Sequence, residues 1–145
     1  MIEVRVCTTI GAPVGDVWST IERIERHTEW MRDAVSIEFE GAQREGVGTA
    51  FSCLTRIGPL STTDRFVVTG WHPPALMAIR HRGAVRGNGD FRLREVDGGT
   101  EFCWEEWLRF PWWLGGAVGE RVGRPVLRRV WAGDVARLKA LVEAS

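Results

Sequence analysis

The N-terminal stretch alternates apolar and polar residues. From Ile2 to Ile10, apolar residues and one threonine occupy every second position, and Glu3 and Arg5 are among the residues between them. A period of two places successive side chains on opposite faces, so this stretch predicts a half-buried β-strand.

A helical period follows a break at Pro13. Apolar residues then recur every three or four positions, which predicts a helix from Pro13 to about Arg26 with the proline in its first turn. A second short helix is predicted around Trp30, with Thr28 as its candidate N-cap.

Between residues 34 and 110 the pattern changes to strands separated by turn residues. The first candidate strand contains Val35, Ile37 and Phe39 in alternation with polar residues. Further strands are predicted near residues 48–57, 60–71, 76–83, 90–96 and 100–110. Glycine and proline clusters mark the turns, at Gly46 to Gly48, Gly58-Pro59, Pro73-Pro74, Gly87 to Gly89 and Asp97 to Gly99. Short connections between consecutive strands favour antiparallel pairing, which gives a seven-stranded antiparallel sheet in total.

The C-terminal part returns to a helical period. Apolar residues recur at helical intervals and predict one long helix from about Trp113 to Glu143. Several glycines weaken its first half, and Pro125 should kink it. With no linker or internal repeat, residues 1–145 are expected to form a single α+β domain.

Two local motifs carry a resemblance to a known family. The segment from Ile10 to Trp18 (IGAPVGDVW), followed by Trp30, is similar to the helix opening of the START/Bet v 1-like helix-grip superfamily, also called SRPBCC. The segment from Gly99 to Phe102 (GTEF) resembles the hairpin that leads into the last strand of that family. A long terminal helix ending in LKAL follows it.

More narrowly, the chain resembles the bacterial polyketide cyclase/dehydrase and lipid-transport group. The resemblance implies a helix-grip fold, in which a curved seven-stranded sheet wraps around the C-terminal helix after two short helices. It also implies a ligand cavity between the sheet and that helix. Members include cyclases, lipid and quinone carriers and hormone receptors, so the fold does not select one function.

Composition excludes several other classes of protein. The 19 basic and 19 acidic side chains balance, so no basic surface field attracts nucleic acid or holds the chain on an anionic membrane. No run of residues reaches the roughly 20 apolar positions of a transmembrane helix, and no signal peptide is evident. We therefore expect a cytoplasmic protein without nucleic-acid binding or stable membrane insertion.

The spacing of the cysteines and the absence of known binding motifs give no indication of a metal or cofactor site. Cys7, Cys53 and Cys103 form neither a C-x-x-C pair nor a zinc spacing, so buried reduced thiols are expected. Neither a phosphate-binding glycine loop nor a nucleophile elbow is present. We accordingly expect no metal and no cofactor.

The last predicted strand carries the first candidate for chemistry. Phe102, Trp104, Leu108 and Phe110 share one face, and Glu106 falls on that same apolar face. Burial among aromatic groups favours the protonated form of a carboxyl group, which suits a general acid or base. Alternatively, Glu106 pairs with an arginine, or a bulge turns it outward.

His81 is the second candidate, because it shares a strand face with Met77 and Ile79. If His81 and Glu106 meet across the cavity, they could exchange a proton with the carbon next to a carbonyl group. The alternative is a hydrogen-bonded core histidine. On another strand Asp64 and Arg65 are adjacent, and the period leaves open which of them faces inward. The remaining predicted ligand contacts are Phe51, Thr55, Asp64, Phe91, Trp113, Val118 and Val122.

The segment from Phe110 to Gly116 (FPWWLGG) joins the last strand to the long helix. Exposed aromatic residues beside glycines could form a lid, pack over the end of the sheet, contact a membrane interface or make a homodimer contact. Packing or a lid is favoured over membrane contact, because no lysine cluster accompanies the tryptophans.

The sequence therefore leaves three functions open. The first is binding or transport of a small hydrophobic molecule such as a lipid, isoprenoid, quinone or aromatic polyketide. The second is a cyclase or dehydratase that uses Glu106 and His81 as acid and base. The third is a regulatory or interaction protein that uses Trp112 and Trp113.

Overall fold

The computed structural model describes all 145 residues and has seven strands in one antiparallel sheet. In chain order the strands are β1 (Ile2–Ile10), β2 (Ala34–Phe39), β3 (Ala50–Ile57), β4 (Leu60–His72), β5 (Leu76–Arg82), β6 (Arg86–Val96) and β7 (Gly99–Arg109). Their order in the sheet is β1-β7-β6-β5-β4-β3-β2, so only the pairing of β1 with β7 joins strands distant in sequence. The predicted sheet is confirmed in strand number and direction.

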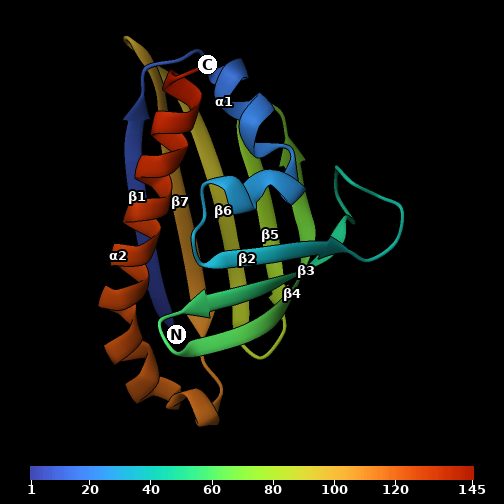
Figure 1. Ribbon diagram of the computed structural model, residues 1–145, viewed down its shortest axis with the longest axis vertical. Helices are drawn as coiled ribbons and strands as arrows, with labels where there is room; N and C mark the ends of the chain where they lie inside the picture. The colour runs from blue at the N-terminus through green and yellow to red at the C-terminus, as the bar shows by residue number, and fades with distance from the viewer.

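The helices lie on one face of this curved sheet. After β1 come α1 (Val14–Ile21) and the 3-10 helix η1 (Ile24–Glu29), and after β7 come the 3-10 turn η2 (Trp112–Leu114) and the long helix α2 (Gly116–Glu143). Figure 1 shows α2 running beside β1 and β7, while β2, β3 and β4 cross in front of the other strands. The sheet therefore curves back toward α2, and the helix-grip architecture is confirmed.

Three predicted boundaries are wrong in detail. The first helix ends at Ile21, because a 3-10 helix that includes Thr28 follows, so Thr28 is not a cap. The glycines at 87–89 lie inside β6 rather than in a turn. The long helix begins at Gly116 because Gly115 has a φ of 89°, a left-handed conformation that ends the η2 turn before it.

The apolar core lies where α1, η1 and the C-terminal half of α2 cover the sheet. Trp30 is 1% exposed, and its ring contacts those of Phe91, Phe102 and Trp104. Leu138 of α2 is fully buried in the same cluster. Burying a large apolar side chain stabilises a fold by roughly 1.5–3 kcal/mol, so this cluster anchors that end of the sheet.

The expectation of three reduced thiols is wrong at two positions. Cys7 of β1 and Cys103 of β7 lie directly opposite each other in the strand register and form a disulfide. The two residues are 96 positions apart, and only the pairing of the first strand with the last brings them together. Cys53 is the remaining free cysteine and is buried.

None of the helices has the length and apolar character needed to cross a membrane.

Candidate functional site

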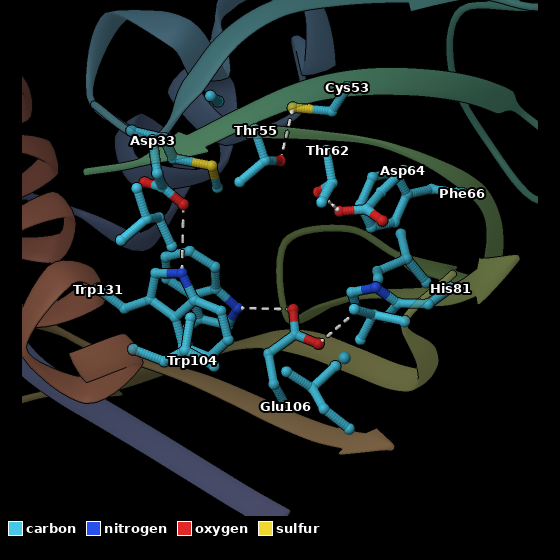
Figure 2. A pocket seen from close by; sticks show the side chains of 18 of the residues that line it. Asp33, Cys53, Thr55, Thr62, Asp64, Phe66, His81, Trp104, Glu106 and Trp131 are labelled. Atoms are coloured by element: carbon cyan, nitrogen blue, oxygen red, sulfur yellow. Dashed lines mark hydrogen bonds and ion pairs between the residues drawn. The ribbon is translucent and has the colours of Figure 1, made fainter. Parts of the chain in front are cut away.

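A cavity of about 470 Å³ lies between the inner face of the sheet and α2. Of the 31 residues that line it, 20 are hydrophobic, and they come from most of the strands, from the segment before β2 and from α2. Two groups of polar side chains reach the cavity, one around Glu106 and one around Asp33 (Figure 2).

Glu106 is at the centre of the first group. The two-residue period of β7 places it between Trp104 and Leu108 on the inner face, where it is 5% exposed. The indole Nε1–H of Trp104 donates to Oε1 at 3.0 Å, and Oε2 lies 2.7 Å from Nε2 of His81 (Figure 2). Both carboxylate oxygens therefore have partners, as a buried carboxylate requires.

Gly89 makes room for this carboxylate. It is the register partner of Glu106 on β6, and a Cβ atom built at Gly89 would lie 2.3 Å from Oε2 of Glu106. No side chain fits at that distance. The glycine that resembled a turn residue in the sequence instead provides the space in which Glu106 lies over the sheet.

His81 comes from β5, and its side chain is nearly buried. Its ring packs edge-on against that of Phe66, with centroids 4.8 Å apart, and its Nδ1 atom has no hydrogen-bond partner. Burial lowers the pKa of His81, but the charge of Glu106, their hydrogen bond and the charge of Asp64 outweigh burial. The pKa of His81 is raised above its ordinary value, which favours an imidazolium–carboxylate pair.

Asp64 completes the first group. The sequence left open whether Asp64 or Arg65 of β4 faces the cavity, and the structure answers this question. It is buried and faces inward, whereas Arg65 faces outward and pairs with Glu40 at 2.9 Å. Thr62 donates its hydroxyl to Oδ2 of Asp64 at 3.2 Å, and Oδ1 is left without a partner. Burial raises the pKa of Asp64, and the nearby charge of Glu106 adds to this effect.

The second polar group joins the first through two tryptophans. Trp104 and Trp131 stack with ring centroids 4.8 Å apart, and Nε1–H of Trp131 donates to Oδ2 of Asp33 at 3.3 Å. In Figure 2 the two indoles lie side by side, each directed at a different carboxylate. This pair of rings thus holds both carboxylates against the cavity wall.

Asp134 of α2 lies behind Asp33 and is fully buried. Burial, followed by the hydrogen bond and the charge of Asp33, raises the pKa of Asp134 to about 8, although Arg137 and the backbone N–H of Arg32 oppose this. Oδ1 of Asp33 and Oδ2 of Asp134 have no hydrogen-bond partner. Asp134 therefore retains a proton near neutral pH, because burial and the neighbouring Asp33 both disfavour its charged form.

Most of the ligand contacts predicted from the sequence line the cavity. These are Phe51, Thr55, Asp64, Met77, Ile79, Phe91, Trp104, Leu108, Phe110 and Val122, together with His81 and Glu106. The structure brings His81 and Glu106 into direct contact. Whether these residues bind a ligand is a separate question.

Three predicted contacts lie outside the cavity. Phe102 is fully buried in the core, because α1 and η1 cover that end of β7. Trp113 lies in the η2 turn and is 52% exposed, and Val118 is 72% exposed in the first turn of α2. Each shares an apolar pattern with true lining residues, and that pattern does not show where along an element the cavity ends.

Sequence reasoning missed the second polar group. Leu127, Trp131 and Asp134 recur at helical spacing, so the pattern of α2 could have placed Trp131 and Asp134 on its inner side. Nothing in the sequence indicates that Asp33, just before β2, faces Asp134. That contact depends on how η1 and the following link pack against α2.

No group of three or more His, Cys, Asp and Glu side chains lies close enough together to hold a metal ion. The polar groups described above are carboxyl groups, His81 and the tryptophan N–H donors. In its protonated form, His81 can donate a proton to an oxygen atom, and in its neutral form it can accept one.

Residues 1–143 match the family model described as polyketide cyclase / dehydrase and lipid transport. The chain belongs to this family. The resemblance seen in the sequence is thereby confirmed over nearly the whole chain.

Solved structures show the same fold as this polyketide cyclase/dehydrase and lipid-transport family member. A protein from Thermus thermophilus has a TM-score of 0.82 at 16% identity, covering 99% of this chain and 98% of its own. The di-domain ARO/CYC StfQ of the steffimycin biosynthetic pathway has a TM-score of 0.79 at 14% identity, covering 99% of this chain and 51% of its own.

The Zhui aromatase/cyclase of Streptomyces sp. R1128 is also similar, with a TM-score of 0.74 at 16% identity and coverage of 98% and 93% of the two chains. At these identities the likeness concerns the fold alone. A comparison with curated protein sequences found no match.

Proposed function

We propose that this protein binds a small, largely apolar molecule in the cavity between the sheet and α2. The observation that carries the proposal is a space of about 470 Å³ in which 20 of the 31 lining residues are hydrophobic. Ligand sites typically have volumes of roughly 300–1,000 Å³ and a few convergent polar groups in an apolar lining.

The polar group around Glu106 indicates the kind of ligand. His81 contacts Glu106, and Asp64 and Thr62 lie near His81, while most of the remaining lining of the cavity is hydrophobic. Such a wall suits an apolar body with one oxygen-bearing end, such as a hydroxyl or carbonyl group. Lipids, isoprenoids, quinones and aromatic polyketides have this character, and the family description names two of these classes, polyketides and lipids.

Mass spectrometry of co-purified small molecules, under native and then denaturing conditions, tests the proposal directly. A discrete bound lipid, quinone or polyketide would identify the ligand. Titration with the neutral fluorophore Nile red provides a second test that needs no retained ligand.

Two matched variants make the titration specific. Thr55 lines the cavity from β3, so Thr55→Trp should fill part of the space and weaken Nile red binding about tenfold or more, the effect of a loss of roughly 1.4 kcal/mol. Ser52 lies on the outer face of the same strand, so Ser52→Trp should leave binding unchanged. Equal effects of both variants, or no binding to the unmodified protein, would contradict the proposal.

A second candidate function rests on the 2.7 Å contact between His81 and Glu106. A protonated His81 can give its proton to a carbonyl or a departing hydroxyl oxygen. The neutral imidazole can then take a proton from the adjacent carbon, while Glu106 stabilises the imidazolium that forms. This acid–base cycle is what a cyclase or dehydratase requires.

Deuterium exchange tests the second candidate with a simple probe. Benzoylacetone combines an aromatic ring with an acidic carbon between two carbonyl groups, and NMR in D₂O follows exchange at that carbon. An enzyme should accelerate exchange, and Glu106→Gln should abolish the acceleration while benzoylacetone still binds. Binding without accelerated exchange would favour a carrier.

A further inference from the structure

A second hollow of about 300 Å³ lies on the other side of the cavity wall. Asp33 and Ile57 line both spaces, so the hollow and the cavity share this part of the wall. The hollow is otherwise lined by residues of the link before β2, the β3–β4 turn and α2, namely Arg32, Arg56, Gly58, Arg129, Val130, Gly133 and Arg137. Four of its nine lining residues are thus arginines.

Three of these arginines have no partner. The guanidinium of Arg137 pairs with Asp134 and donates to the backbone oxygen of Trp30 at 3.1 Å. The side chains of Arg32, Arg56 and Arg129 make no hydrogen bond or ion pair, and all three residues are exposed. Like charges brought together from three separate elements repel one another, and a bound anion would offset that repulsion.

The acids beneath the hollow compensate little of this charge. Asp134 retains its proton near neutral pH, since burial and the nearness of Asp33 raise the pKa of Asp134 to about 8. The pair then carries one negative charge against four guanidinium groups, a surplus of three positive charges.

Gly133 leaves the guanidinium of Arg137 uncovered. A Cβ atom at Gly133 would lie 3.4 Å from Nη2 of Arg137, so a longer side chain there would cover that guanidinium. The other three arginines are exposed, and the planar forks of the guanidinium groups match the oxygens of a phosphate group.

We propose that this hollow binds a phosphate or diphosphate group. Phosphate is favoured over carboxylate because it carries more charge and more acceptor oxygens, which several converging guanidinium groups can engage together. The group belongs either to a soluble phosphorylated molecule or to a ligand whose apolar part occupies the neighbouring cavity. In the second case the inference rests on the proposed function.

Isothermal titration with three probes tests the proposal and separates the two sources. Farnesol and farnesyl diphosphate share one apolar chain and differ in the diphosphate, while pyrophosphate has no chain. We expect farnesyl diphosphate to bind at least about tenfold more tightly than farnesol, a gain of roughly 1.4 kcal/mol. The double variant Arg56→Gln/Arg129→Gln should remove this gain.

A matched control uses arginines of α2 that do not line the hollow. Arg121→Gln/Arg128→Gln removes the same charge from exposed positions, so it should preserve the preference for farnesyl diphosphate. Because all four substituted residues are exposed, circular dichroism should show folded protein in both double variants.

Each outcome has a defined meaning. Pyrophosphate binding that depends on Arg56 and Arg129 supports a site for soluble phosphates. A diphosphate gain without pyrophosphate binding supports one ligand that spans both spaces. The proposal is overturned if the diphosphate brings no gain and pyrophosphate does not bind, or if both double variants behave alike. Failure of farnesol alone counts against the cavity and leaves the pyrophosphate test of the hollow intact.

Discussion

Nε2 of His81 lies 2.7 Å from Oε2 of Glu106, although the two residues are 25 positions apart on different strands. Neither strand is next to the other in the sheet, since β6 runs between β5 and β7. The contact passes over Gly89 of β6, the position where the intervening strand has no side chain. An acid, a base and the glycine between them thus form one unit on the cavity wall.

The charge of Glu106 should control the titration of His81. In Glu106→Gln the carboxylate is lost while burial of His81 remains, so the pKa of His81 should fall from its raised value. NMR titration of the histidine ring protons measures this shift, with the exposed His72 as internal reference. An unchanged His81 titration would show that the carboxylate does not influence the imidazole.

Gly89→Ala should disrupt the contact between His81 and Glu106, because Gly89 lies on β6, the strand between them. The new Cβ atom would overlap the carboxylate of Glu106, and we expect a loss of about 1–3 kcal/mol in the free energy of unfolding, typical of overpacking. Adding Glu106→Ala should recover much of this loss, because it removes the overlapping atoms.

Gly15→Ala is the comparison for Gly89→Ala. A Cβ atom at Gly15, an exposed residue of α1, would meet nothing within 4 Å, so this change should stabilise the helix by roughly 0.5–1 kcal/mol. Chemical denaturation measures all of these variants. A Gly89→Ala protein as stable as the unmodified one would contradict the close packing over β6.

Trp104→Phe should cost more stability than Trp18→Phe. Both tryptophans are 5% exposed, but only Nε1 of Trp104 has a partner, Oε1 of Glu106. Trp104→Phe therefore leaves a buried carboxylate oxygen unsatisfied, at an additional cost of roughly 1–3 kcal/mol. Equal losses in urea denaturation would argue against this hydrogen bond.

The proton that Asp134 retains in the folded protein should make stability depend on pH. Because the pKa of Asp134 is raised from 3.8 to about 8, the folded protein retains a proton that the unfolded chain has already lost. The folded state binds more protons in this range, so the free energy of unfolding falls as pH rises from about 4 to about 8.

Asp134→Asn should flatten that fall by at least about 1 kcal/mol, because an amide does not ionise. Asp97→Asn is the control, since Asp97 is exposed in the β6–β7 turn. Melting temperatures recorded at several pH values test this. A slope that persists in Asp134→Asn would assign the pH dependence to other groups.

Local patterns in the sequence predicted the strands and the long helix of the fold. Alternation in β1 and β7 and the helical period of α2 predicted the sheet, the long helix and the inward position of Glu106. The same alternation could not choose between Asp64 and Arg65, because two adjacent polar residues fit either register. The resemblance carried by the IGAPVGDVW segment then supplied the way the sheet wraps around α2.

Local patterns in the sequence could not predict contacts between distant segments. The disulfide between Cys7 and Cys103 depends on the pairing of the first strand with the last, and the nearness of Asp33 to Asp134 depends on how the link after η1 packs against α2. Gly89 shows a related limit. A glycine that permits a turn and a glycine that leaves room for a neighbour look identical in a sequence.

Variants of Trp112 and Trp113 test the hypothesis that this protein acts through contacts with a partner. Trp112 is 86% exposed and Trp113 is 52% exposed, and Val118 and Val122 of α2 are also exposed. Exposed apolar residues of this kind are typical of contact surfaces.

Trp112→Ala/Trp113→Ala should change the free energy of unfolding by no more than about 0.5 kcal/mol, because neither ring is in the core. Any self-association seen by sedimentation velocity should weaken, while Nile red binding persists because neither tryptophan lines the cavity. A double variant that associates as before would remove this strip as a homodimer surface, and one that unfolds would instead show that the two rings pack over the end of the sheet.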